Sequence, residues 1–146
     1  MEPLERRLAR IGVLTIADAL QVVRQVARAL AVAHAHDVVH RDLKPDNIFL
    51  VSDPEVAGGE RAKILDFGIA TRLGDDPTAQ ESGVLGTPAF MSPEQCRGAS
   101  DVEQRSDVYA LGCVLFTLVT GHLPFGGDEA GDVMAMHVNA PPPVPS

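Results

Sequence analysis

Residues 40–47 read His40-Arg41-Asp42-Leu43-Lys44-Pro45-Asp46-Asn47, and this octet is the most informative stretch of the chain. Its residue types suit the transfer of a phosphoryl group to a hydroxyl. The Asp42 carboxylate can orient an attacking hydroxyl and accept its proton. Lys44 supplies a cation that can balance negative charge on the phosphate in transfer. Asn47 offers a neutral amide oxygen, a hard ligand of the kind that Mg²⁺ prefers.

A second segment, Asp66-Phe67-Gly68, adds a carboxylate that can serve as another metal ligand. Asp66 follows a run of residues that predicts a strand, and Gly68 gives the backbone beside it conformational freedom. The tripeptide alone is a weak signal, because three-residue strings recur by chance. Together with the octet, and in this order, it indicates a phosphoryl-transfer site rather than a solvated acidic turn.

The apolar pattern predicts an α+β fold that is mainly helical, with a small sheet. A long helix is expected over residues 15–36, with Thr15 as its N-cap. Its buried stripe is expected to comprise Ile16, Leu20, Val23, Ala27, Leu30 and His34. Further helices are expected over 4–11, over 106–120 (apolar nearly all round and therefore buried on every side) and over 129–139. Short strands are expected at 38–39, 47–51 and 62–65, with a Gly-containing turn at 52–60.

These features resemble the large, C-terminal lobe of a eukaryotic-like serine/threonine protein kinase of the bacterial type. The octet matches the catalytic-loop pattern H-R-D-L-x-x-x-N, and residues 66–68 match D-F-G. Residues 86–94 resemble the end of the activation segment, with Ser92 where the family's A-P-E motif has alanine. Residues 107–125 resemble the buried central helix of that lobe and the turn after it. The resemblance extends from about residue 4 to residue 143, without the small N-terminal lobe.

The resemblance implies ATP as the phosphoryl donor, Mg²⁺ or Mn²⁺ as the metal, and a protein Ser/Thr hydroxyl as the acceptor. Asp42 would be the catalytic base, and Lys44 would contact the γ-phosphate. Asn47 and Asp66 would hold the metal. Phe49 would lie under the adenine, where the family more often has an aliphatic residue.

Further positions take structural or regulatory roles on the same resemblance. Thr87 would lie near the base and Lys44, which in the family accompanies Ser/Thr rather than Tyr substrates. Asp107 would hydrogen-bond the backbone of the catalytic loop, or simply cap its own helix. The remaining matched positions are His40, Phe67, Gly68 and Glu94, the last expected to lack the Arg that pairs with it in the family.

Arg41 suggests regulation, because in the family such an Arg binds a phosphate on the activation loop. Candidate acceptors are Thr78 and Ser82, with self-phosphorylation in trans as one route; the alternative is that both are ordinary loop residues. Three histidines, His34, His36 and His40, lie close in sequence, but a shared metal site is not expected from them.

Composition narrows the function further. The formal net charge of −8 and the 4% aromatic content argue against nucleic-acid binding. Two cysteines are too few for a disulfide framework, and no segment reads as a signal peptide or membrane span. A cytoplasmic protein is therefore expected, although parts outside this sequence could add an anchor.

The 146 residues contain no Gly-rich phosphate-covering loop and no strand Lys with a helix Glu to hold it. Residues 1–146 are therefore expected to be a partial kinase domain, with an extended Pro-rich tail at 140–146 and negligible activity in isolation. One alternative is a non-catalytic, kinase-like binding module. Such a module would have no need of all four proposed catalytic and metal-binding residues, which are Asp42, Lys44, Asn47 and Asp66. A small-molecule phosphotransferase is a second alternative, disfavoured by Lys44 and residues 86–94.

Overall fold

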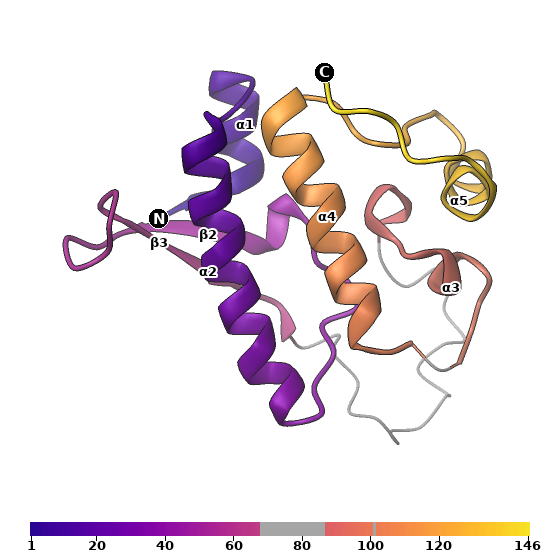
Figure 1. The fold of residues 1–146 in the computed structure, drawn as a ribbon, viewed down its shortest axis with the longest axis horizontal. Coiled ribbons are helices and arrows are strands. Elements are labelled where there is room, and N and C mark those ends of the chain that lie inside the picture. The colour runs from indigo at the N-terminus through magenta and orange to yellow at the C-terminus, as the bar shows by residue number, and fades with distance from the viewer. Residues whose placement is uncertain (68–86, 101) are drawn as a thin grey trace.

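The computed structural model describes residues 1–67, 87–100 and 102–146. It has the expected mainly helical α+β fold with a small antiparallel sheet. Helices α2 (Ile16–Ala35) and α4 (Gln104–Thr120) pack against each other near the centre (Figure 1). The other elements are β1 (Glu2–Pro3), α1 (Leu4–Ile11), β2 (Ile48–Ser52), β3 (Glu60–Ile64), α3 (Pro93–Cys96), α5 (Ala130–Asn139) and the 3₁₀ turns η1 (Pro45–Asn47) and η4 (Pro88–Phe90). The sheet packs on α2, and α3 and α5 lie beyond α4.

Helix α2 has the expected bounds but buries a different face. The Thr15 hydroxyl oxygen accepts a hydrogen bond from the Asp18 amide at 3.1 Å, which caps the helix as predicted. Its buried residues are Ala19, Val22, Val26 and Leu30. The predicted stripe was wrong for Ile16, Leu20 and Ala27, which are all exposed, the first two at 70% and 51%. The helix is apolar on two adjoining faces, and packing on α4 and the sheet selects one of them.

Helix α4 ends at Gly121, whose φ of 75° is the left-handed conformation that terminates many helices. The expectation that α4 is buried on every side was wrong at Val108, which is 63% exposed. Its neighbours among the described elements cover only part of its circumference, so an apolar residue on the remaining part faces outward. None of the described helices combines the length and apolar character needed to cross a membrane.

The sheet has the order β1-β2-β3. Two of the predicted strands are present as β2 and β3, and the structure pairs them antiparallel across the predicted turn, with Ile48 opposite Ile64 and Ser52 opposite Glu60. The loop between them ends in two glycines at positive φ, where a side chain would be strained. The strand predicted at residues 38–39 is only an isolated β-bridge at Val38, and β1 is too short to show a two-residue alternation in sequence.

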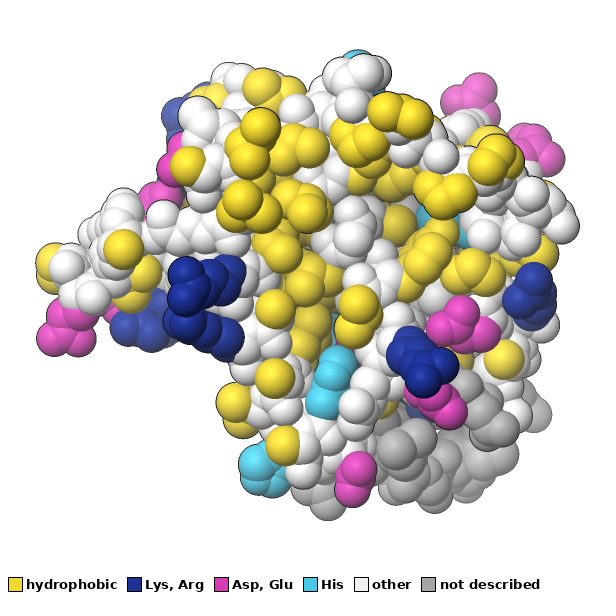
Figure 2. Space-filling model, in the orientation of Figure 1, with side chains coloured by type: hydrophobic (Ala, Val, Ile, Leu, Met, Phe, Trp, Pro, Cys, Tyr) yellow, Lys and Arg dark blue, Asp and Glu magenta, His cyan; other side chains and the backbone are white. Residues whose placement is uncertain are grey.

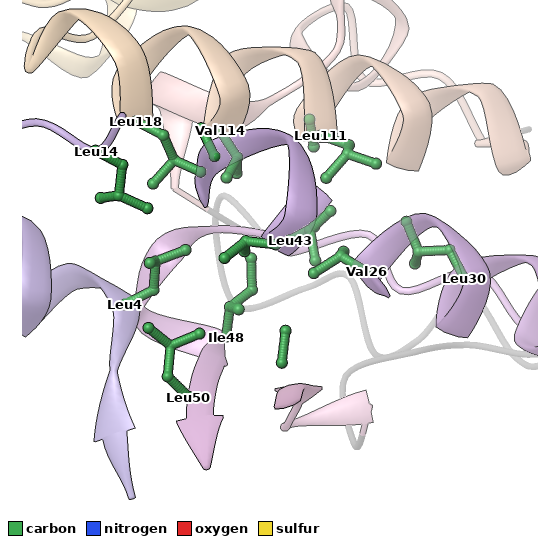
Figure 3. Packing of buried hydrophobic residues seen from close by; sticks show 14 residues of the cluster. Leu4, Leu14, Val26, Leu30, Leu43, Ile48, Leu50, Leu111, Val114 and Leu118 are labelled. Carbon is green, nitrogen blue, oxygen red and sulfur yellow. The ribbon is translucent and has the colours of Figure 1, made fainter. Parts of the chain in front are cut away.

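The hydrophobic core joins α1, α2, α4, the sheet and the octet (Figure 3). Leu43 is 1% exposed and lies in this core between α2 and α4. Ile48 and Leu50, alternate residues of β2, are buried in the same cluster. Burying Leu43 anchors the octet at its middle, and the residues on either side of it, Asp42 and Lys44, remain partly exposed.

Candidate active site

The start of the octet is held by one buried carboxylate from α4. Asp107 is 1% exposed, and its two oxygens accept hydrogen bonds from the backbone amides of His40 at 2.8 Å and Arg41 at 2.9 Å. His34 Nε2, on α2, lies 2.8 Å from the same carboxylate. A buried carboxylate needs such partners to offset the loss of water. The backbone contact is the one expected of Asp107, whereas the His34 contact was not foreseen.

Asp42, Lys44 and Thr87 come together at the centre of the site. Lys44 Nζ donates a hydrogen bond to Thr87 Oγ1 at 2.7 Å and lies 3.6 Å from one Asp42 carboxylate oxygen. The Thr87 amide donates to the other oxygen at 3.2 Å. The Asp42 side chain is 9% exposed and that of Lys44 22%, so both reach solvent from a partly enclosed position. A carboxylate, a cation and a hydroxyl therefore meet at the surface.

Asn47 is oriented by the same loop. Its Nδ2 donates to the Asp42 carbonyl at 2.7 Å, which leaves its side-chain oxygen available as an acceptor. The Asn47 carbonyl in turn accepts from the Leu65 amide at 2.8 Å, so the chain approaching Asp66 is tied to the octet. Asp66 is exposed and has a φ of 62°, an uncommon backbone conformation for a residue other than glycine.

His40 connects the octet to the Asp66 segment a second time. It is fully buried, and its Nδ1 accepts from the Asp42 amide at 3.2 Å. Its Nε2 therefore carries the hydrogen and donates to the Leu65 carbonyl at 3.2 Å. Phe67 packs edge-on against the imidazole, with ring centroids 4.7 Å apart. The His40 ring therefore contacts both the octet, which carries Asn47, and the segment that carries Asp66.

Comparison with known families agrees with this geometry. The family model described as protein kinase domain matches residues 1–141. The chain belongs to the protein kinase family.

Similar curated kinases are bacterial. The serine/threonine-protein kinase PknA of Mycobacterium tuberculosis is 43% identical over 142 residues, which are 97% of this chain and 31% of the relative. The serine/threonine-protein kinase pkn3 of Myxococcus xanthus is 42% identical over 149 residues, 99% of this chain and 27% of the relative. PknB of Mycolicibacterium smegmatis is 42% identical over 130 residues, 88% and 20% respectively. The kinase resemblance is confirmed, and the chain spans less than a third of each relative.

The A-P-E-like segment of this kinase chain is tied to α4 by side chains. Ser92 caps α3 in a capping box with Gln95, and its hydroxyl donates to Ser106 Oγ at 2.8 Å. Ser106 donates to the Glu94 carboxylate at 2.6 Å. Burial pushes the pKa of Glu94 upward, but the Ser106 hydrogen bond and others outweigh it and hold the pKa below its ordinary value. Within the described ranges Glu94 forms no ion pair, and its carboxylate is instead bound by the Ser106 hydroxyl.

Arg41, the second residue of the octet, connects the octet to α3. Its carbonyl accepts from Gln95 Nε2 at 2.8 Å, and its φ of 69° turns the chain sharply before Asp42. Its Nε is buried, and no group in the described part of the chain satisfies it. Sequence reasoning missed Gln95, although the S-x-x-Q spacing from Ser92 signals a capping box.

Of the remaining predicted site residues, the structure describes Phe49 but not Gly68, Thr78 or Ser82. Phe49 is half-buried in β2, opposite Lys63 of β3. The described residues contain no group of three or more His, Cys, Asp or Glu side chains placed to hold a metal.

Proposed function

We propose that this chain carries the catalytic residues of a serine/threonine protein kinase, which transfers the γ-phosphoryl group of ATP to a protein hydroxyl. The observation that carries the proposal is the meeting of the Asp42 carboxylate, the Lys44 ammonium and the Thr87 hydroxyl. A non-catalytic binding module has no chemical need to keep the whole set of Asp42, Lys44, Asn47 and Asp66.

Asp42 is proposed as the base. The acceptor hydroxyl donates its hydrogen to the carboxylate, which takes the proton as the hydroxyl oxygen bonds to phosphorus and the bond to the ADP oxygen breaks. Lys44 stabilises negative charge on the phosphoryl oxygens in transfer. Thr87 holds both groups in register, since its amide and hydroxyl contact one each. Its place beside the base also underlies the proposed preference for Ser/Thr acceptors.

Asn47 and Asp66 are proposed to hold Mg²⁺. The pair fits a hard cation, because Asn47 presents a free amide oxygen once its NH₂ group is bonded to the loop, and Asp66 presents an exposed carboxylate. Two protein oxygens suit Mg²⁺, which completes its shell with phosphate oxygens and water. When bound, the ion would neutralise charge on the phosphates.

Arg41 is proposed as the receptor for a phosphate placed on Thr78 or Ser82, in trans by a second copy. A guanidinium whose Nε is buried without a partner in the described part of the chain supports this, because such a group gains most from an anion.

The chain is proposed to form the large lobe of the kinase domain. The reaction also needs a Gly-rich loop over the phosphates and a lysine that contacts the α- and β-phosphates. The 146 residues contain no such Gly-rich loop. Their two lysines are Lys44, in the octet, and Lys63, exposed on β3, and neither is proposed for that contact. We therefore expect negligible activity from residues 1–146 alone, and activity from a product that also supplies those parts.

The experiment incubates the product of the complete reading frame with radiolabelled ATP, Mg²⁺ and a mixed protein substrate, followed by phosphoamino-acid analysis. Asp66→Asn is the test variant, and Glu55→Gln, which removes an exposed carboxylate from the β2–β3 loop, is the matched control. The proposal predicts phosphoserine or phosphothreonine, lost in Asp66→Asn and retained in Glu55→Gln. Absence of any transfer, with tight partner binding instead, would favour a non-catalytic module.

A further inference from the structure

His137 is a buried histidine that meets side chains from two other parts of the fold. It lies in the last turn of α5 and is 4% exposed. Its imidazole packs edge-on with Tyr109 of α4 and with Phe125, at ring-centroid distances of 5.6 Å and 5.0 Å. Figure 2 shows hydrophobic side chains gathered over the region where α4 and α5 meet. Because aromatic rings hold the imidazole on two sides, its two nitrogens point in fixed directions.

One nitrogen of this ring faces the turn η4. Nε2 is buried, and no group in the described part of the chain satisfies it. Helix α5 packs against η4, whose first two residues are Pro88 and Ala89. Burial lowers the pKa of His137, whereas the backbone carbonyls of Ala89 and Pro88, which face the ring, oppose that shift. Nε2 is the nitrogen open to these carbonyls, because Nδ1 already contacts Tyr109.

The groups on both sides of the ring favour one tautomer. Carbonyl oxygens only accept hydrogen bonds, so the η4 side favours a hydrogen on Nε2. Nδ1 is then an acceptor, and it lies 2.7 Å from the Tyr109 hydroxyl oxygen. Burial raises the pKa of Tyr109 to about 12, so at neutral pH the hydroxyl has a hydrogen to donate. Polar contacts therefore connect Tyr109 on α4, through His137, with the backbone of η4.

The turn η4 is continuous with the candidate active site. Thr87 is its N-cap, and the Thr87 carbonyl accepts from the Phe90 amide at 3.0 Å. The amide and the hydroxyl of Thr87 contact Asp42 and Lys44, respectively. A shift of η4 would therefore move both contacts together. Misplacing catalytic groups by about 1 Å can lower a rate about a hundredfold, so the support beneath η4 matters for the reaction.

We propose that His137 is a positioning residue for phosphoryl transfer, because its Nε2–H holds η4, and with it Thr87, beside the catalytic groups. The side chain is buried, so it acts through the turn and not on the substrate itself. A buried donor is costly when it is unpaired, which favours conformations in which the η4 carbonyls stay close to Nε2. The inference rests on the proposed function and adds to it a residue outside the catalytic motifs.

The kinetic test compares three substitutions of His137 in the product of the complete reading frame, with a Ser/Thr peptide as acceptor. His137→Gln keeps an amide donor at the place of Nε2, His137→Asn keeps only an acceptor for Tyr109, and His137→Leu keeps neither. We expect the Asn and Leu variants to lower kcat/KM for the peptide about two- to tenfold, as for a lost hydrogen bond, with KM for ATP unchanged.

The Gln variant should recover most of that loss. His122→Asn, which alters an exposed histidine, is the matched control and should leave kcat/KM unchanged. A ring that serves only packing predicts that Leu is tolerated at least as well as Gln. That order, or equal losses in Gln and Asn, would overturn the proposal.

Amide hydrogen exchange separates this inference from the proposed function, because it needs no phosphoryl transfer. The amides of Phe90 and Met91 donate to the carbonyls of Thr87 and Pro88 at 3.0 and 3.2 Å, and their exchange reports the opening of η4. We expect both amides to exchange about two- to tenfold faster in His137→Leu and His137→Asn than in His137→Gln. That pattern supports the positioning role even if the protein transfers no phosphate. Equal exchange in all three variants would overturn it even if the protein is an active kinase.

Discussion

Replacing Asp107 with asparagine tests how the catalytic loop is held. The Asp107 carboxylate accepts the His40 and Arg41 amides at 2.8 and 2.9 Å from a site that is 1% exposed. An asparagine of the same shape has one acceptor oxygen, so its NH₂ group must face one of the two amides, donor against donor. Hydrogen bonds to a charged group contribute about 1.5–3 kcal/mol each, and the orphaned amide adds its own desolvation cost. We expect local opening of the loop to become easier by about 2–3 kcal/mol.

The assay is native-state amide hydrogen exchange on peptides that cover residues 38–44, measured in the product of the complete reading frame. A change of about 2–3 kcal/mol corresponds to exchange roughly 30- to 150-fold faster at His40 and Arg41. Asp132→Asn, an exposed acid near the start of α5, is the matched control and should leave this region unchanged. Unaltered protection at both amides in Asp107→Asn would refute the reasoning.

Two further perturbations probe packing and charge. Leu43→Ala removes a core side chain that is 1% exposed and should destabilise the fold by about 2–5 kcal/mol in urea unfolding, whereas an unchanged midpoint would contradict the anchoring role. His137 is 4% exposed, its Nδ1 lies 2.7 Å from the Tyr109 hydroxyl, and burial holds its pKa below its ordinary value. A histidine of lowered pKa binds fewer protons folded than unfolded, so its contribution to stability is lost as pH falls below about 6.5. His137→Asn keeps an acceptor for the Tyr109 hydroxyl. Between pH 7 and pH 5 this variant should lose less free energy of unfolding than the unsubstituted protein. An equal loss in the two proteins would contradict the assignment of this pH dependence to His137.

The sequence carried the chemistry of the octet because that information is local. Asp42, Lys44 and Asn47 fall within six residues, and each residue type suits one task in phosphoryl transfer. The end of α1 and the start of α2 could also be predicted, because Gly12 closes α1 and Thr15 caps α2.

What the sequence could not supply depends on packing between distant segments. Helix α2 is apolar on two adjoining faces, and only its neighbours decide that Val22 rather than Leu20 is buried. His34 was assigned to an apolar stripe, yet it meets Asp107, 73 residues away in sequence. A histidine in such a stripe does signal the need for a partner, although it does not say which one.

The central claim is that Asp42 acts as the base of a phosphoryl-transfer site. The most direct measurement is the single-turnover rate of transfer from ATP to a Ser/Thr peptide by the product of the complete reading frame, compared with its Asp42→Asn variant, alongside ATP affinity. The claim predicts a rate about 10²- to 10⁴-fold lower in the variant, with ATP affinity within a few-fold. A variant that transfers phosphate at an undiminished rate would contradict it.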